Sequence, residues 1–311
     1  MSIADTLKRA AADAAGAQQY PAATLYLVAT PIGNLADLTL RAIHALVLAD
    51  AVACEDTRVG AQLLRHLGLE HKALLPLHRH NEAAAAAAVV ERLARGDRVA
   101  FVSDAGTPAV SDPGARLVAA VHAAGHRVLP LPGPSSVTTA LSVAGDVRAQ
   151  GFAFAGFAPA RGRERTQWLQ AQCARDDALV LFEAPHRIEA LAAQLAALDA
   201  RRTVTLCREL TKQFETVATM PAAELPAWLA ADADRRRGEF VLVLHAREPG
   251  DADDAPADVA EALRWLPALL GALPLKQAVA IAAQVSGAPR NALYDRALAI
   301  RQEGGDGAGD D

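Results

Sequence analysis

The sequence predicts an α/β protein with two α/β domains followed by a small C-terminal helical domain. From Thr24 onward, short apolar runs alternate with segments of helical spacing. This alternation is typical of mostly parallel sheets that are covered by helices on both faces. A second series of such runs begins after residue 135, and an acidic segment separates it from a final helical segment. The length of 311 residues suits two domains with a small addition.

The first domain is predicted at residues 23–134. Apolar runs of strand length end in loops rich in Gly, Pro and Asp, which indicates strands. Asn81 is suited to cap the start of a helix, and Gly96 and Gly125 are typical of positions where helices end. Strands are predicted at Leu25–Ala29, Ala51–Cys54, Arg98–Ser103 and Arg127–Leu131, and helices at Leu38–Leu48, Asn81–Leu93 and Gly114–Ala124. Residues 1–22 are Ala-rich, contain interspersed charges and lack the features of a signal peptide, so we expect a flexible leader.

The second domain is predicted at residues 135–247. A helix is expected from Ser136 to Ala144, and hairpin-like spacing near the end of the domain predicts a mixed sheet. Phe152, Phe154 and Phe157 are expected in the core of a strand. The remaining elements are strands near Phe152–Phe154, Leu179–Phe182, Thr203–Cys207 and Phe240–His245, and helices near 164–174 and 186–198.

The C-terminal part has three predicted segments. An acidic linker is expected at 248–259, a helical domain that resembles a helix-turn-helix at 260–302, and a flexible tail at 303–311. Within the helical domain, Leu275–Val285 and Arg290–Ile300 have helical spacing on either side of a turn.

Composition excludes several classes of protein. The net charge of −5 belongs to the C-terminal part, since residues 1–247 are close to neutral, so any nucleic-acid surface must be a local patch. The three cysteines lack metal-ligand spacing, which predicts reduced, mostly buried thiols, no metal site and a cytoplasmic location. No apolar run is long enough for a membrane span, so we expect no membrane partner.

The most informative stretch lies between Val99 and Ser136. Two apolar runs there end in loops of Gly, Pro, Ser, Thr and Asp, and the carboxyl ends of parallel strands are where open α/β sheets bind ligands. The loops carry almost no charge beyond Asp104 and Asp112, whereas a phosphate site would need a Lys or Arg. A small neutral or cationic ligand, held mainly by backbone groups, is therefore expected.

An ordered set of motifs identifies the family that the chain resembles. Each motif alone is weak evidence, but their order along residues 24–247 is specific, and together they resemble the tetrapyrrole methylase superfamily. The motifs are Thr30-Pro-Ile-Gly-Asn-Leu35, Cys54-Glu-Asp-Thr-Arg58, Val102-Ser-Asp-Ala-Gly-Thr-Pro108, Ser111-Asp-Pro-Gly114, Leu131-Pro-Gly-Pro-Ser135, Glu183-Ala-Pro-His-Arg187, Arg208-Glu-Leu-Thr-Lys212 and Gly238-Glu-Phe240. More closely, the set resembles the members that methylate the ribose 2′-oxygen of a cytidine in 16S rRNA.

The resemblance implies that S-adenosylmethionine binds in a cleft between the two α/β domains. Thr107 stands where tetrapyrrole-modifying members usually carry Asp, which marks a departure from their pattern. Seen alone, Gly106 and Gly133 are equally compatible with simple turns. The residues that the resemblance places at the cofactor are Pro31, Gly33, Ala105, Gly106, Thr107, Val110, Gly133, Ser135, Ser136, Glu183 and Leu210.

The same resemblance implies 16S rRNA or the small ribosomal subunit as partner, and a homodimer. A ribose hydroxyl is a poor nucleophile, so a base would assist, although positioning alone is an alternative. Candidate bases are Asp104, Glu183 and His186, of which His186 is equally suited to cap a helix. Candidates for RNA contact are Arg58, Arg161, Arg163, Arg165, Arg187 and Lys212.

Each of these basic residues also has a structural interpretation. Arg58 could belong to an internal ion-pair cluster with Glu55 and Asp56, and residues 161–165 could form a solvated loop. The C-terminal helices suit either an RNA contact or a cap at a dimer surface. Two other hypotheses remain at this point: methylation of a tetrapyrrole-type small molecule, and a non-enzymatic RNA-binding protein that senses S-adenosylmethionine.

Overall fold

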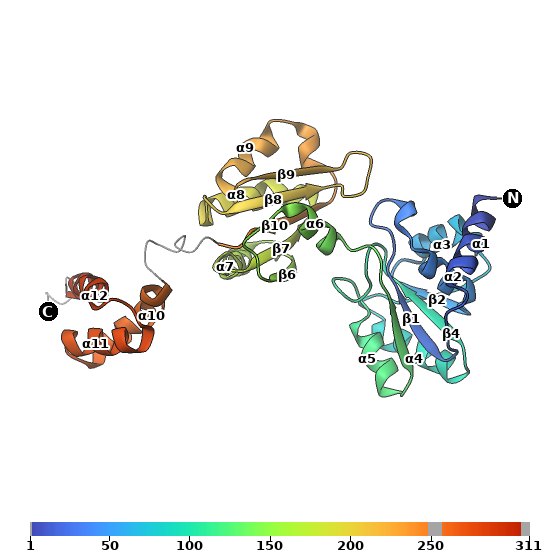
Figure 1. Ribbon diagram of the computed structural model, residues 1–311, viewed down its shortest axis with the longest axis horizontal. Helices are drawn as coiled ribbons and strands as arrows, with labels where there is room; N and C mark the ends of the chain where they lie inside the picture. The colour runs from blue at the N-terminus through green and yellow to red at the C-terminus, as the bar shows by residue number, and fades with distance from the viewer. Residues whose placement is uncertain (1, 248–256, 306–311) are drawn as a thin grey trace. The chain divides into compact units, whose positions relative to one another are not determined.

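The first α/β domain is a parallel sheet of five strands with helices on both faces (Figure 1). The structure is a computed structural model that describes residues 2–247 and 257–305. The strand order is β3-β2-β4-β1-β5. The strands are β1 (Thr24–Val28), β2 (Ala51–Cys54), β3 (Ala73–Pro76), β4 (Arg98–Val102) and β5 (Arg127–Leu131). The helices are α1 (Ile3–Ala15), α2 (Leu40–Leu48), α3 (Thr57–His66), α4 (Glu82–Ala94) and α5 (Ala115–Ala123).

Alternating side chains of the central strands fill two cores. On β4, Val99 and Phe101 pack with α4 and α5, whereas Ala100 and Val102 pack with α1, α2 and α3 on the opposite face. Successive side chains of a strand point to opposite faces, so an apolar strand of this kind must be covered on both sides. The parallel, doubly covered sheet that the sequence predicts is therefore confirmed.

The N-terminal residues differ from the flexible leader that we expected. Residues 3–15 form α1, which Ser2 and Asp5 cap through reciprocal hydrogen bonds. Ala11 and Ala15 are buried, and Leu7 packs against the core beside α2. The small alanine side chains allow this close helix packing.

The second α/β domain has a mixed sheet with the order β6-β7-β10-β8-β9. Only β6 and β7 pair in parallel, and the other neighbours are antiparallel, as the hairpin-like spacing predicts. The strands are β6 (Phe152–Phe157), β7 (Ala178–Glu183), β8 (Thr203–Arg208), β9 (Thr216–Pro221) and β10 (Phe240–Leu244). The helices are α6 (Ser136–Ala144), α7 (Gly162–Cys173), α8 (Ile188–Leu198) and α9 (Leu225–Ala230).

The two faces of this sheet are covered by different elements. Helices α7, α8 and α9 pack on one face, and α6 packs on the other. Ile32, from the loop after β1, joins the core under α6 together with Val180 and Leu210. A loop of the first domain is therefore anchored in the core of the second.

The C-terminal unit is a separate helical cluster of α10 (Ala257–Ala272), α11 (Leu275–Ser286) and α12 (Arg290–Gly305). Both predicted helices are present, and α10 precedes them, with buried Leu266 and Leu293 in their shared core. Most of the predicted linker at 248–259 and of the predicted tail at 303–311 lies outside the described residues. No helix in the described ranges combines the length and apolarity needed to cross a membrane.

Candidate active site

Three loops meet at one edge of the first sheet. Strand β1 lies between β4 and β5 and runs parallel to both, so the segments that follow these three strands leave the same edge. The loops begin at Ala29, Ser103 and Pro132. This edge is the usual place for a ligand site in a parallel sheet.

Hydrogen bonds tie the three loops to one another. Thr30 and Gly106 exchange backbone hydrogen bonds of 2.9 and 3.0 Å across two loops. The hydroxyl of Ser103 donates to the Gly106 carbonyl at 2.9 Å, and that of Thr107 donates to the Pro134 carbonyl at 3.0 Å. Gly106 has a φ of 79°, a conformation that L side chains rarely adopt. The loops therefore form one rigid wall, to which the hydroxyl of Ser103 contributes a hydrogen bond.

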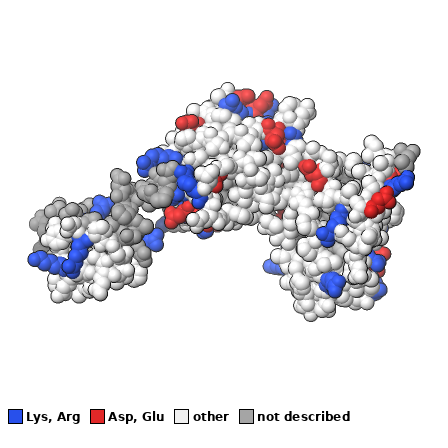
Figure 2. All heavy atoms as spheres, in the orientation of Figure 1, with Lys and Arg blue, Asp and Glu red and all other residues white. Residues whose placement is uncertain are grey.

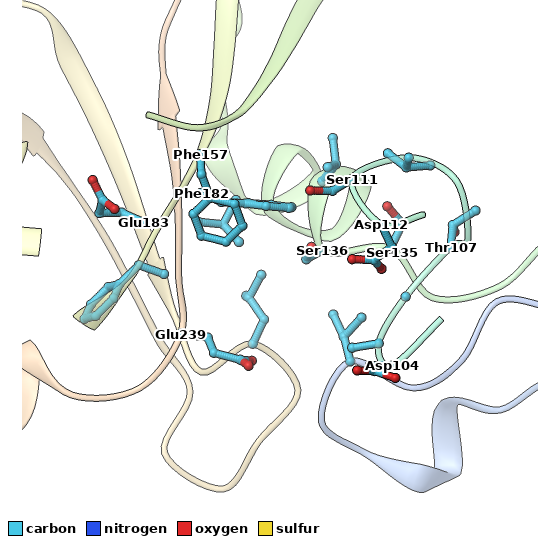
Figure 3. A pocket seen from close by; sticks show the side chains of 18 of the residues that line it. Asp104, Thr107, Ser111, Asp112, Ser135, Ser136, Phe157, Phe182, Glu183 and Glu239 are labelled. Carbon is cyan, nitrogen blue, oxygen red and sulfur yellow. The ribbon is translucent and has the colours of Figure 1, made fainter. Parts of the chain in front are cut away.

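A cavity of about 390 Å³ lies against this wall, within the range of small-molecule sites. The first domain contributes residues of the loop after β4, and the second contributes the ends of β6, β7 and β10 and the start of α6 (Figure 3). Its lining includes eight of the predicted cofactor residues: Ala105, Gly106, Thr107, Val110, Ser135, Ser136, Glu183 and Leu210.

The charged residues of the cavity lining are acidic. Asp104, Asp112, Glu183 and Glu239 line it, and no Lys, Arg or His is among its described lining residues. Burial, and secondarily the charge of Asp104, raises the pKa of Asp112 above its usual value. A cation nearby would stabilise the ionised form of such a carboxylate. The cavity therefore favours a positively charged ligand and disfavours a phosphate.

The other three predicted cofactor residues lie outside this cavity. Pro31 and Gly33 line a neighbouring groove. Gly133 lines neither hollow, and a Cβ added to it would lie 3.0 Å from the Cβ of Ala29. Gly133 therefore allows close packing of the loops after β1 and β5, which is a structural role.

Glu183 is a poor candidate for a base, although it lines the cavity. Its side chain is fully buried, and the guanidinium groups of Arg165 and Arg187 lie 2.9 and 2.8 Å from its carboxylate oxygens. The backbone N–H of Ala184 also donates to it at 3.0 Å. These three donors engage both carboxylate oxygens, so Glu183 holds the surrounding segments together.

The other two candidate bases differ in position. Asp104 is exposed at the cavity, where one carboxylate oxygen accepts a hydrogen bond of 3.0 Å from the backbone N–H of Asp56. His186 is exposed, does not line the cavity and forms no side-chain cap at the turn of Pro185–Arg187. Asp104 is thus the candidate that the geometry supports.

Two of the predicted RNA-binding arginines have structural partners. Arg165 lies on the buried face of α7, with 6% of its side chain exposed, and donates to Glu183, to Gln194 and to the carbonyl of Pro159. Arg187 donates to the Ala158 and Pro159 carbonyls besides Glu183. The buried Glu183 engages both guanidinium groups, which favours a structural role for them, and an RNA contact for these two stays a prediction.

The remaining basic candidates lie at the surface. Arg161 and Arg163 are exposed, at the start of α7 rather than in a loop. Arg58 is 90% exposed and pairs with Asp56, the N-cap of α3, whose pKa it lowers to about 2 through its side-chain hydrogen bond. Lys212 pairs with Glu209 at 3.0 Å and with Glu239 at 2.9 Å. Acidic and basic side chains lie in small groups on the face that Figure 2 shows.

Two aromatic rings form a wall of the cavity that was not predicted from the sequence. Phe157 and Phe182 line it with ring centroids 5.4 Å apart, although Phe157 was expected in a strand core. Strand β6 is an edge strand, and its register shifts between Phe154 and Gly156. Phe154 pairs with Val180 and Phe157 with Phe182, so the extra residue of the bulge places Phe157 on the same face as Phe154, where both rings contact Phe182 beside the cavity.

Comparison with known proteins places both parts of the chain in a family. Residues 24–226 match the family model of tetrapyrrole (corrin/porphyrin) methylases, and residues 256–301 match the RsmI C-terminal HTH domain. Proteins named ribosomal RNA small subunit methyltransferase I from Escherichia coli O157:H7 and Neisseria meningitidis serogroup B are 45% and 46% identical. The first alignment covers 88% of this chain and 94% of the relative, and the second covers 90% and 94%.

A solved structure shares the fold. It is a uroporphyrin-III C-methyl transferase from Thermus thermophilus in complex with S-adenyl homocysteine, with a TM-score of 0.51 and 19% identity. The match covers 72% of this chain and 98% of that chain. It confirms the predicted arrangement of two α/β domains.

Proposed function

Because this chain belongs to the tetrapyrrole methylase family, and to the group of its members named ribosomal RNA small subunit methyltransferase I, we propose that it methylates RNA of the small ribosomal subunit. S-adenosylmethionine is the methyl donor. The acceptor is the ribose 2′-oxygen of a cytidine in 16S rRNA. Such a substrate places the enzyme in the cytoplasm, and we expect it to act as a homodimer.

The acidic cavity is the observation that carries this proposal. S-adenosylmethionine has a sulfonium and an ammonium group, and the cavity offers Asp104 and Asp112 without a basic residue among its described lining. Phe157 and Phe182 add an apolar wall. Ser135 and Ser136 begin α6, where hydroxyl and backbone N–H groups suit a carboxylate. The residues present therefore fit this cofactor.

When bound, the cofactor supplies an electrophilic methyl group on sulfur, and the protein must align an acceptor oxygen with it. The tied loops around Thr30 and Gly106 hold the wall of the cavity without rearrangement. Such fixed alignment accounts for a large part of the rate in group transfer. On the side of the protein, the carboxylate of Asp104 would accept the proton that the acceptor hydroxyl gives up.

Methyl transfer with labelled S-adenosylmethionine tests the proposal. The acceptors are deproteinised 16S rRNA, the assembled small subunit and a porphyrinoid. We expect label in RNA only, at a position where the following phosphodiester bond resists alkali, because a methylated 2′-oxygen cannot attack it. Label in the porphyrinoid, label on a base, or cofactor binding without transfer to any acceptor would each contradict the proposal.

A further inference from the structure

A groove runs along α3 beside the cofactor cavity, and it is the neighbouring groove that Pro31 and Gly33 line. Its volume is about 600 Å³, and its lining includes Leu35, Val59, Gln62, Arg65, His66 and Asp104. Asp104 lines both hollows. It marks the edge of the cavity in Figure 3.

The wall between the two hollows is the bridge between the loops after β1 and β4. Gly106 lines the cavity, whereas its partner Thr30 lines the groove. Ser103, which donates to the Gly106 carbonyl, also faces the groove. The bridge therefore borders both hollows, and the two hollows meet at Asp104, which lines both.

The groove has an apolar part and a basic part. Leu35 and Val59 line the groove, and 49% and 38% of their surfaces are exposed to solvent. Packing in the core does not explain large apolar side chains that are exposed to this extent. Arg65 and His66 stand at the end of α3 and are exposed. Arg65 forms no side-chain hydrogen bond or ion pair with a residue in the described ranges. An apolar floor beside a free guanidinium is chemistry that suits a nucleotide, whose base is flat and whose phosphate is anionic.

We propose that this groove binds the acceptor nucleotide of the RNA, an assignment that rests on the proposed function. The phosphate lies at Arg65 and His66, the base lies over Leu35 and Val59, and the ribose hydroxyl lies at Asp104. The donor in the cavity and the acceptor in the groove thus meet at Asp104, the residue that lines both hollows. The groove should influence RNA binding without influencing cofactor binding.

The basic residues Arg65 and His66 also have a structural explanation, because basic side chains near the C-terminus of a helix stabilise that helix. Arg95 provides a matched control for that effect. It is the exposed C-cap residue of α4, and it lines neither hollow. Arg65→Ala and Arg95→Ala therefore remove comparable helix-end interactions, but only the first removes a groove cation.

The experiment measures methyl transfer to the acceptor RNA that the wild-type protein labels, at several salt concentrations, together with the Kd of S-adenosylmethionine by calorimetry. For Arg65→Ala we expect roughly a five-fold rise in KM for RNA. The negative slope of log(kcat/KM) against log[salt] should become shallower by about 0.7, the contribution of one phosphate contact to a single strand. Arg65→Lys should retain that slope. The Kd of the cofactor should not change in either variant.

The outcomes separate this inference from the function on which it rests. If wild-type protein labels no RNA, the proposed function fails, and the assignment of the groove fails with it. If wild-type protein labels RNA but Arg65→Ala matches Arg95→Ala in KM and in salt slope, only the groove assignment is wrong. An Arg65→Ala variant that loses cofactor affinity would also overturn it, because the two hollows would then not be separate sites.

Discussion

Replacement of Arg165 by Met tests whether this arginine supports the fold or contacts RNA. In the structure the Arg165 guanidinium donates to the carboxylate of Glu183 at 2.9 Å, to the Gln194 side chain at 2.8 Å and to the Pro159 carbonyl at 3.0 Å. Methionine fills a similar volume but leaves Glu183 with Arg187 as its remaining cationic partner. Breaking a buried ion pair from one side costs about 3–5 kcal/mol.

Urea unfolding at neutral pH measures this cost as a change in the free energy of unfolding. Since domains are stable by only about 5–15 kcal/mol, the expected loss is a large fraction of the total. Arg163→Met is the matched control, because Arg163 lies on the same helix and is exposed. Its expected effect is within about 0.5 kcal/mol.

A second variant separates the buried charge from other effects of the substitution. Arg165→Met combined with Glu183→Gln removes both partners of the ion pair, so its loss of stability should be smaller than the sum of the losses in the two single variants, each of which already breaks the pair. At a temperature where all variants are folded, Arg165→Met should have the wild-type KM for RNA. A loss of stability below about 1 kcal/mol, together with a raised KM, would refute the structural role and restore the RNA contact.

The remaining predictions concern the cavity and the buried thiols. Gly106→Arg should abolish cofactor binding, because it places a cationic side chain at the cavity in a φ of 79°; near-native affinity by calorimetry would show that the cavity is not the cofactor site. Asp112→Asn should weaken cofactor binding but stabilise the free protein at neutral pH: the raised pKa of Asp112 means that its ionised form opposes folding, and wild-type cofactor affinity should fall as acid protonates it. A variant that binds normally and is less stable would contradict both expectations. Burial raises the pKa of Cys54 to about 11 and that of Cys207 to about 12, so both thiols should resist alkylation at mildly alkaline pH until urea unfolds the protein; rapid labelling of the native protein would show that these thiols are accessible.

The strands and loops that form the cavity wall could be predicted because their signals are local. Each of β1, β4 and β5 is an apolar run followed by Gly, Pro or small polar residues. Strands β3 and β9 and helices α3 and α9 were not predicted. Strands β3 and β9 lie at sheet edges and are only partly buried, so their apolar pattern is weak. Helix α3 contains Gly60, whose lack of a Cβ lets the helix approach Cys54.

Arg165 shows where a local signal existed and was misread. Its neighbours Arg161 and Arg163 suggested a basic loop, yet Arg165, Leu169 and Cys173 follow one another at helical spacing and share the buried face of α7. That spacing indicates the inner side of a helix. It does not identify the partner, because Glu183 lies on another element.

The sequence by itself determined the family, the two-domain α/β fold and the loops that meet at the cavity, because these depend on short motifs and on the alternation of apolar residues. Only the tertiary structure decided which charges are paired and which are free. It placed Arg165 and Arg187 on the buried Glu183, left Asp104 at the junction of two hollows and brought Phe157 to the cavity through a bulge. Ion pairing and burial depend on contacts between distant segments, so they cannot be read from the order of residues along the chain.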